Sequence, residues 1–226
     1  HKRLETSIND SSLIKVPSHS IKFNNNPTDF VGHEISLEEL SKTPLALHYP
    51  KILRLLEFYV NKGWKIYVEK RVYLAEFLIA GTIDCILFKG KEFIIVDWKT
   101  NKDDLHFTSG YYKKINGVKS NTWIEKKEYY RYPLNKLQTC KGNGYTLQLS
   151  SYAYMMECWG FICKALILCH IRELVEEVNI QKEKRVDIIQ IDYIKWDIKN
   201  MFNNKKSKDN EKNTPSKMRY SEKFFW

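Results

Sequence analysis

The sequence predicts an α/β fold class of the α+β kind, with one small mixed sheet flanked by helices. Apolar residues keep helical spacing over residues 50–63 and again over residues 145–160. Between these segments, residues 64–99 alternate with the period of two that is typical of strands. Hydrophobic residues make up 43% of the 226 residues, which is enough to bury a core and excludes a wholly disordered chain.

The N-terminal third contains signals for a polar arm and two helices. Residues 1–30 are polar and are predicted to form the arm. The stretch Ser36–Glu39 fits a capping box, so a short helix should start after Ser36 and stop before Pro44. Pro50 suits a first helical turn and Gly63 suits the position just past a helix end, so these two residues bracket a second, amphipathic helix.

Three consecutive strands should follow, joined as an antiparallel meander. In the first, alternation places Ile66 and Val68 on one face, and Tyr67, Glu69 and Arg71 on the other. The turn Lys89–Lys91 should join the second strand to the third, which is rich in β-branched residues. The expected strands are Trp64–Tyr73, Phe77–Phe88 and Glu92–Lys99.

The rest of the chain divides into an insertion, a second set of elements and a tail. Residues 101–145 are basic and rich in aromatic side chains, which indicates an insertion into the domain. Beyond it we expect a helix over 145–160, strands over 164–170 and 186–191, and a helix over 193–202. The predicted organisation is therefore an arm (1–30), one domain (31–202) and a basic flexible tail (203–226).

Charge and cysteine content limit the environment and the partners. Lys and Arg number 37 against 27 Asp and Glu, a formal net charge of +10, which favours polyphosphate partners such as nucleic acid. The five cysteines are odd in number and form no Cys-x-x-Cys pair, which favours a reducing compartment. No apolar run approaches the roughly 20 residues of a membrane-spanning helix, and His1–Glu5 lacks the apolar core of a signal peptide.

The most informative residues lie on the second and third predicted strands. Alternation puts Asp97 and Lys99 on the same face, so a carboxylate and an ammonium group can address one substrate atom. Asp84 lies one hairpin earlier and can come alongside Asp97 if the register permits. Two converging carboxylates can hold Mg²⁺, and a neighbouring Lys can stabilise charge on a phosphate. The alternative is a solvated ion pair, but the apolar run before Asp97 delivers it to a buried edge, where charge is costly.

An ordered series of three motifs carries a family resemblance. The series consists of Gly81–Asp84, then Asp97–Thr100, then Gln148–Tyr152. It resembles the PD-(D/E)XK nuclease superfamily, and most closely the RecB-like exonuclease branch, over roughly residues 30–175. The resemblance implies a restriction-endonuclease-like core in which Asp84 and Asp97 bind the metal and Lys99 is the catalytic lysine.

The same resemblance suggests further metal ligands. The backbone carbonyl of Trp98 would be one, and Glu69 corresponds to an additional acidic residue that often supports the metal. Glu69 is equally explained as an outward strand residue paired with a neighbouring basic side chain, and Glu76 is a weaker rival. His33 is the candidate for a metal-binding His found in RecB-like members, although it precedes the Ser36 cap, and His48 is the alternative.

Other implied residues would contact the DNA. Gln148 and Tyr152 are four residues apart and therefore share a helix face, and the resemblance places both at the active site. Tyr152 is otherwise a core residue. The hydroxyl of Thr100 either reaches a phosphate or caps the strand end.

The insertion is the candidate for a nucleic-acid-binding surface. Residues 101–145 contain nine Lys or Arg against four Asp or Glu, and Lys113, Lys114 and Arg131 are the expected phosphate contacts. The tyrosines interleaved with them either stack on bases or form a small core of the insertion itself.

Together these features predict a Mg²⁺- or Mn²⁺-dependent DNA exonuclease acting in replication, recombination or repair, of the phage, viral or organellar kind. We expect it inside a cell (cytoplasm, host cytoplasm or organelle), without a membrane. The expected partners are DNA, as single-stranded ends or linear duplex, and replication or recombination proteins. The alternatives are an endonuclease of the same fold, acting on DNA or RNA, or a module that binds nucleic acid without cutting it. No iron–sulfur cluster is expected, because no Cys precedes Cys85.

Overall fold

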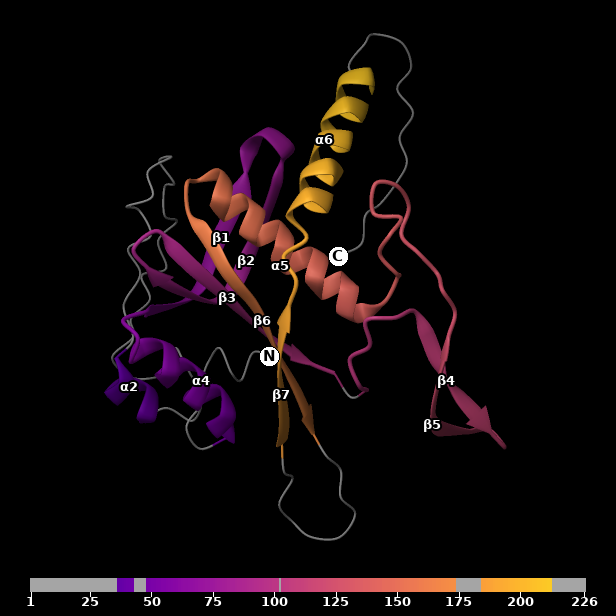
Figure 1. Ribbon diagram of the computed structural model, residues 1–226, viewed down its shortest axis with the longest axis horizontal. Coiled ribbons are helices and arrows are strands. Elements are labelled where there is room, and N and C mark those ends of the chain that lie inside the picture. The colour runs from indigo at the N-terminus through magenta and orange to yellow at the C-terminus, as the bar shows by residue number, and fades with distance from the viewer. Residues whose placement is uncertain (1–35, 43–47, 102, 174–183, 213–226) are drawn as a thin grey trace.

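A five-stranded mixed sheet forms the centre of the protein. The computed structural model describes residues 36–42, 48–101, 103–173 and 184–212. Within these ranges the sheet has the order β1-β2-β3-β6-β7 (Figure 1), in which β3 and β6 are parallel and the other neighbours antiparallel. The strands are β1 (Lys65–Leu74), β2 (Ile79–Lys89), β3 (Glu92–Thr100), β6 (Ile162–Glu173) and β7 (Lys184–Ile191).

Helices cover both faces of the sheet, so its central strands are buried on both sides. One core contains Leu40 of α2 (Leu37–Ser41) and Ile52 of α4 (Pro50–Val60), packed with Trp98 of β3. The second core contains side chains of α5 (Lys141–Cys158) and α6 (Lys195–Lys212), packed with Phe93 and Ile95 of β3. The predicted fold class, a small mixed sheet flanked by helices, is confirmed.

The helix signals near the N-terminus act as the sequence predicts. Ser36 Oγ accepts a hydrogen bond from the backbone N of Glu39 at 3.2 Å, and Glu39 Oε2 accepts one from the backbone N of Ser36 at 2.7 Å. Pro50 occupies the first turn of α4, and Gly63 follows that helix with a φ of 82°. This left-handed conformation costs Gly little, because it has no Cβ.

β1 departs from the simple alternation expected of it. Ile66 and Val68 contact the first core, but Val72 and Leu74 lie in the second, although all four are even-numbered. The change occurs at Glu69, whose φ of 50° breaks the regular strand geometry. The prediction of unbroken alternation from Trp64 to Tyr73 is therefore wrong, because the strand turns over between its two halves.

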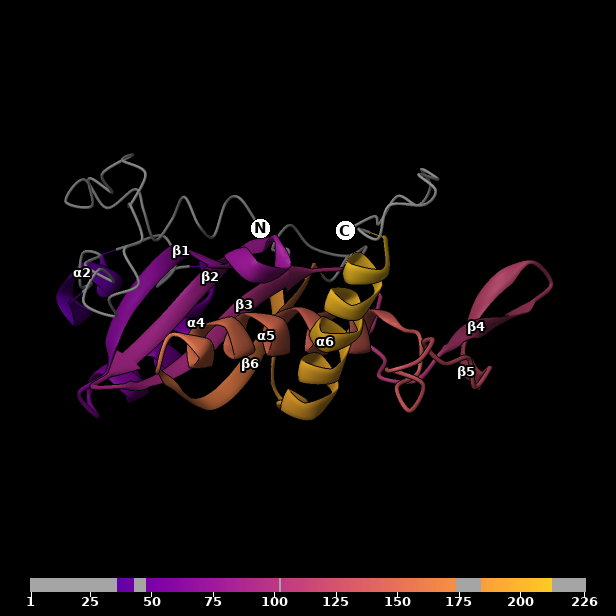
Figure 2. The same cartoon turned by 90° about the horizontal axis from the view of Figure 1, so that it is seen from above.

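The insertion forms a separate two-stranded hairpin. Its strands, β4 (Gly110–Ile115) and β5 (Val118–Glu125), pair with each other and not with the central sheet. Figures 1 and 2 show this hairpin projecting from one end of the molecule, beyond the N-terminal end of α5. The insertion ends at Cys140, earlier than predicted, because α5 begins at Lys141.

The last described helix is longer than the sequence predicts. The expected helix ends at Phe202, whereas α6 continues to Lys212. The prediction of a loose tail from residue 203 is thus wrong as far as Lys212, and residues 213–226 lie outside the described ranges. The chain has no Gly or Pro between Lys195 and Pro215 that would stop the helix. No helix within the described ranges is both long and apolar enough to span a membrane.

Candidate active site

Asp84 and Asp97 occupy facing positions on β2 and β3, one step beyond the last pair of their ladder. The ladder between these strands ends at the pair Cys85 and Val96, and the two aspartates are the next residues in register. There Asp84 Oδ2 accepts a hydrogen bond from the backbone N of Trp98 at 3.1 Å. The carboxylate thus bonds a main-chain donor at the point where the ladder stops.

Both carboxylates are buried, and that of Asp97 pairs with an ammonium group. Asp84 is 8% exposed and Asp97 is 1% exposed. Lys99 Nζ lies 2.7 Å from Asp97 Oδ2, which places both side chains on the same face of β3, as alternation predicts. Burying a charge is costly unless it is paired, so this arrangement indicates a constrained polar site inside the fold.

Helix α5 supplies the other wall of the site. Gln148 Oε1 accepts a hydrogen bond from Lys99 Nζ at 3.1 Å, and Gln148 Nε2 donates one to Tyr152 Oη at 3.0 Å. Gln148 and Tyr152 therefore lie on one helix face, and Lys99 contacts Gln148 of α5 as well as Asp97 of its own strand. The amide orientation of Gln148 is assigned from this network, because only its carbonyl can accept from an ammonium group.

Gly81 on β2 makes room for the Tyr152 ring. A Cβ atom at this position would lie 2.3 Å from Tyr152 Cε1 and 2.8 Å from Tyr152 Oη. Such distances are far inside van der Waals contact, so any larger residue would displace the ring. The first motif thus contributes to the site through Asp84, which carries the charge, and through Gly81, which admits the tyrosine.

The sequence reasoning missed Tyr145, a neighbour of Lys99, and Asn101, which contacts that tyrosine. The ring centroid of Tyr145 lies 4.8 Å from Lys99 Nζ, within cation–π distance. Asn101 Nδ2 donates a hydrogen bond to Tyr145 Oη at 3.0 Å. A signal existed, because Tyr145 precedes Gln148 by three residues and therefore lies on the same helix face.

His170 on β6 is a further buried polar residue on this side of the sheet. It pairs in register with Lys99 and is 1% exposed, and its Nε2 has no hydrogen-bond partner among the described residues. Burial lowers its pKa from the ordinary value, and the nearby Arg172 lowers the pKa further, against opposite contributions from Asp187 and Asp104. The apolar run that surrounds His170 gives no sign of a polar position.

The remaining predicted site residues lie in different surroundings. Glu69 occupies the β1 position opposite Asp84, between the pairs Val68–Cys85 and Lys70–Ile83, but its side chain is exposed. Glu76 and Thr100 are exposed as well. His48 is exposed beside Tyr49, and His33 lies outside the described residues.

The buried carboxylates offer oxygen ligands to the expected divalent cation. Among the described residues no group of three or more His, Cys, Asp or Glu is arranged to hold a metal ion. The structure does bring together Asp84 and Asp97 beside the backbone of Trp98. Mg²⁺ takes oxygen ligands and is commonly bound through one or two carboxylates, with water and substrate phosphate completing the shell. The two carboxylates fit that mode of binding, without Glu69.

The predicted phosphate contacts lie on and next to the hairpin. Lys113 and Lys114 on β4 and Arg131 in the loop after β5 are all exposed. Three exposed tyrosines also belong to this region. The exposed fractions are 49% for Tyr111, 50% for Tyr129 and 76% for Tyr132. Charge and aromatic rings are therefore available to a ligand on the surface of the insertion.

Other aromatic residues of the insertion pack against each other. His106 stacks on Trp123 with ring centroids 3.7 Å apart, and Tyr112 packs edge-on against both rings. The interleaved aromatics are thus divided, because Tyr112 and Trp123 form a small core while the exposed tyrosines remain on the surface.

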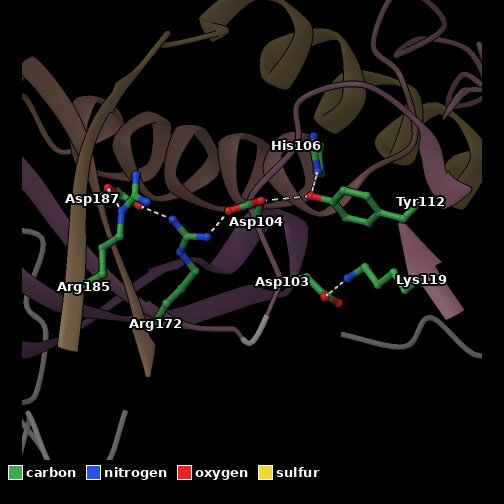
Figure 3. A network of polar contacts seen from close by, with 8 residues as sticks. All are labelled: Asp103, Asp104, His106, Tyr112, Lys119, Arg172, Arg185 and Asp187. Carbon is green, nitrogen blue, oxygen red and sulfur yellow. Dashed lines mark hydrogen bonds and ion pairs between the residues drawn. The ribbon is translucent and has the colours of Figure 1, made fainter. Parts of the chain in front are cut away.

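A polar network joins the insertion to the central sheet. Figure 3 shows Asp104 between Tyr112 of the hairpin, which donates a hydrogen bond to it at 3.0 Å, and Arg172 of β6. Arg172 also contacts Asp187 of β7, with Nη2 and Oδ2 3.0 Å apart. Lys119 of β5 pairs with Asp103 in the connecting segment. These contacts attach the hairpin to the strands that flank the candidate site.

Comparisons with known proteins find little similarity to this chain. No protein-family model matches the chain, and no curated protein matches it at a significant level. The crystal structure of a candidate exonuclease from Eubacterium rectale is similar, with a TM-score of 0.34 and 15% sequence identity. The similarity covers 76% of this chain and 62% of that one, so the chain spans less than two thirds of its neighbour's length.

Proposed function

We propose that the chain is a metal-dependent DNA exonuclease that hydrolyses phosphodiester bonds in replication, recombination or repair. One observation carries the proposal: a continuous set of contacts links Asp97, Lys99, Gln148 and Tyr152 beside Asp84, where β2 and β3 separate. The set joins two buried carboxylates and an ammonium group of intermediate burial. These groups suit a reaction in which negative charge builds up on a phosphate.

Each residue of the set has a distinct role in the proposed reaction. Asp84, Asp97 and the Trp98 carbonyl would hold Mg²⁺ or Mn²⁺, which supplies Lewis acidity and lowers the pKa of a bound water. Lys99 stabilises the charge that develops on the phosphate oxygens. Gln148 orients the lysine and is itself oriented by Tyr152.

The net charge supports DNA as the substrate. The motif series supports cleavage from DNA ends. The net charge of +10 and the exposed cations of the insertion favour a polyanion as ligand. The Gln148-x-x-x-Tyr152 pattern, which resembles RecB-like exonucleases, favours cleavage from ends.

The proposal is tested by offering DNA with and without ends. End-labelled single- and double-stranded linear DNA and covalently closed circles are incubated with the protein in Mg²⁺, Mn²⁺ or EDTA. We expect metal-dependent loss of the linear forms, while the circles persist and EDTA protects both. The labelled products then give the polarity of cleavage.

Matched variants assign the activity to this site. Asp97→Ala and Lys99→Ala should abolish cleavage, whereas Lys164→Ala, which removes a surface lysine paired with Glu92 at 3.2 Å, should leave it intact. Nicking of closed circles would replace the exonuclease by the endonuclease alternative. Binding without cleavage in either metal would reject catalysis altogether and favour a nucleic-acid-binding module.

A further inference from the structure

An open pocket of about 450 Å³ adjoins the candidate active site. It lies between the first turns of α5 and the loop that follows β5. Tyr130 and Thr139 line it from the loop, and Lys141, Gly144, Tyr145 and Gln148 line it from the helix. A volume of this order is typical of sites that bind a small organic group.

The pocket shares two residues with the surroundings of Lys99. Gln148 accepts the hydrogen bond from Lys99 Nζ, and the ring of Tyr145 lies 4.8 Å from the same nitrogen. A phosphate at Lys99 would therefore lie next to the pocket. Continuity with the site favours a part of the strand that carries this phosphate as the occupant.

The walls of the pocket are held in place without a ligand. Backbone hydrogen bonds of 2.9 Å from Tyr130 to Leu137 and from Thr139 to Glu128 close the loop on itself. Asn143 in the first turn of α5 ties the loop to the helix, because its Nδ2 donates to the backbone O of Gln138 at 2.8 Å. A pre-formed wall reduces the entropy that binding would otherwise cost.

The chemistry of the lining indicates an aromatic ligand in preference to a bare phosphate. The first amides of α5 are already occupied, since the N of Gly142 donates to the backbone O of His106 at 3.2 Å and the N of Asn143 donates to Cys140 Sγ at 3.5 Å. They do not form an open anion cradle. Two tyrosine rings remain, with Lys141 exposed at the rim, and this combination suits a flat base joined to a phosphate.

We propose that the pocket between Tyr130 and Tyr145 receives one unpaired nucleobase of a DNA strand whose neighbouring phosphate lies at Lys99. This inference rests on the proposed function for the identity of its ligand. Lys141 contacts the phosphate that flanks the base. Occupation requires a base free of its complement, so the site acts on single-stranded DNA or on a frayed end.

Fluorescence of a base analogue tests the pocket apart from catalysis. Short single-stranded oligodeoxynucleotides carrying 2-aminopurine at successive positions are titrated with the protein in EDTA, so that cleavage does not interfere. We expect quenching at one position as the analogue stacks on tyrosine. Tyr130→Ala should abolish that quenching and weaken binding about 5- to 150-fold, which corresponds to about 1–3 kcal/mol of stacking, whereas Tyr130→Phe should retain both.

A second variant fills the pocket and leaves the tyrosines in place. A Cβ atom at Gly144 would meet only Tyr130 Oη, at 3.8 Å, so a larger side chain fits and extends into the cavity. Gly144→Leu should abolish the quenching, and Gly144→Ala should not. Both changes favour the helix by up to about 1 kcal/mol, so loss of binding would not stem from unfolding, which circular dichroism verifies.

Three results would overturn or separate the proposals. Wild-type quenching and affinity in Tyr130→Ala and Gly144→Leu would reject the pocket, even if the protein cuts DNA. Loss of quenching in Tyr130→Ala but not in Gly144→Leu would place the base elsewhere on that ring and reject the pocket as well. Loss in both, in a protein that binds but never cuts, would support the pocket and reject the exonuclease.

Discussion

The candidate active site and the hairpin insertion are built on opposite principles. At the site, Asp84 and Asp97 are buried, and the largely buried Lys99 contacts both Asp97 and Gln148. On the insertion, Lys113, Lys114 and several tyrosines are exposed to solvent. The candidate active site can therefore hold a reacting group in a fixed position. The insertion offers charge and contact area to a long ligand.

The largest effect should come from the buried ion pair. Asp97→Asn and Lys99→Met should each reduce cleavage by about 10²- to 10³-fold, because each removes charge aimed at the reacting phosphate. Lys99→Met should also lower the free energy of unfolding by about 3–5 kcal/mol, since it removes the ammonium group beside a carboxylate that is 1% exposed.

The double variant Asp97→Asn/Lys99→Met separates these two effects. It should regain much of the stability in denaturant unfolding but none of the activity. Lys164→Met serves as the control and should change the unfolding free energy by less than about 1 kcal/mol, as for an exposed pair. Equal loss of stability in Lys164→Met and Lys99→Met would contradict the contrast between buried and exposed charge.

The next effect concerns the packing that supports the lysine. Gly81→Ala places a methyl group 2.3 Å from Tyr152 Cε1, so the ring must move and its contact with Gln148 is lost. We expect a loss of about 1–3 kcal/mol in unfolding free energy, as for an overpacked core, together with reduced cleavage. In the double variant with Tyr152→Leu the two losses should not add. Additive losses would show that the methyl group acts elsewhere.

A smaller effect is expected on the insertion. Lys114→Gln removes one exposed charge and should reduce the slope of log affinity against log salt by about 0.7 for single-stranded DNA. The matched control is Lys91→Gln, which also removes one exposed charge. Lys91 precedes the N-terminal end of β3, whereas Asp97 lies near the C-terminal end of that strand. Titrations at several salt concentrations compare the two, and an equal change in both would mean that the insertion has no special place in binding.

The smallest effect concerns stability and pH at His170. Its pKa is lowered in the folded state by burial, so below about pH 6.5 the unfolded chain binds more protons than the folded chain. The free energy of unfolding should therefore fall as the pH falls from about 6.5 through the folded-state pKa, by less than about 1.4 kcal/mol per pH unit for one group. His170→Leu should reduce this slope in denaturant unfolding, and an unchanged slope would assign it to other groups.

Most of the fold and the centre of the site could be predicted from the sequence because they depend on short-range geometry. Alternation alone places Asp97 and Lys99 together, and helical spacing places Gln148 with Tyr152. The contact between Lys99 and Gln148 joins residues 49 positions apart and required the family resemblance.

The features that could not be predicted arise from tertiary structure. A positive φ at Glu69 leaves no mark in the sequence, because residues other than Gly rarely adopt it. The buried position of His170 depends on strands from both halves of the chain, β3 and β7, pairing with β6. The division of the insertion's aromatics, with Tyr112 packed and Tyr132 exposed, depends on how the hairpin folds back on residues 104–106.

Trp98 links the backbone of the candidate active site to the packing of the first core. It stands between Asp97 and Lys99, its side chain is fully buried in the first core, and its backbone N is bonded to Asp84. The backbone of the site therefore cannot open without withdrawing the largest side chain of that core. We expect the Trp98 amide to exchange its hydrogen only through global unfolding, so that a variant weakened at a position away from the site loses activity in proportion to its unfolded fraction.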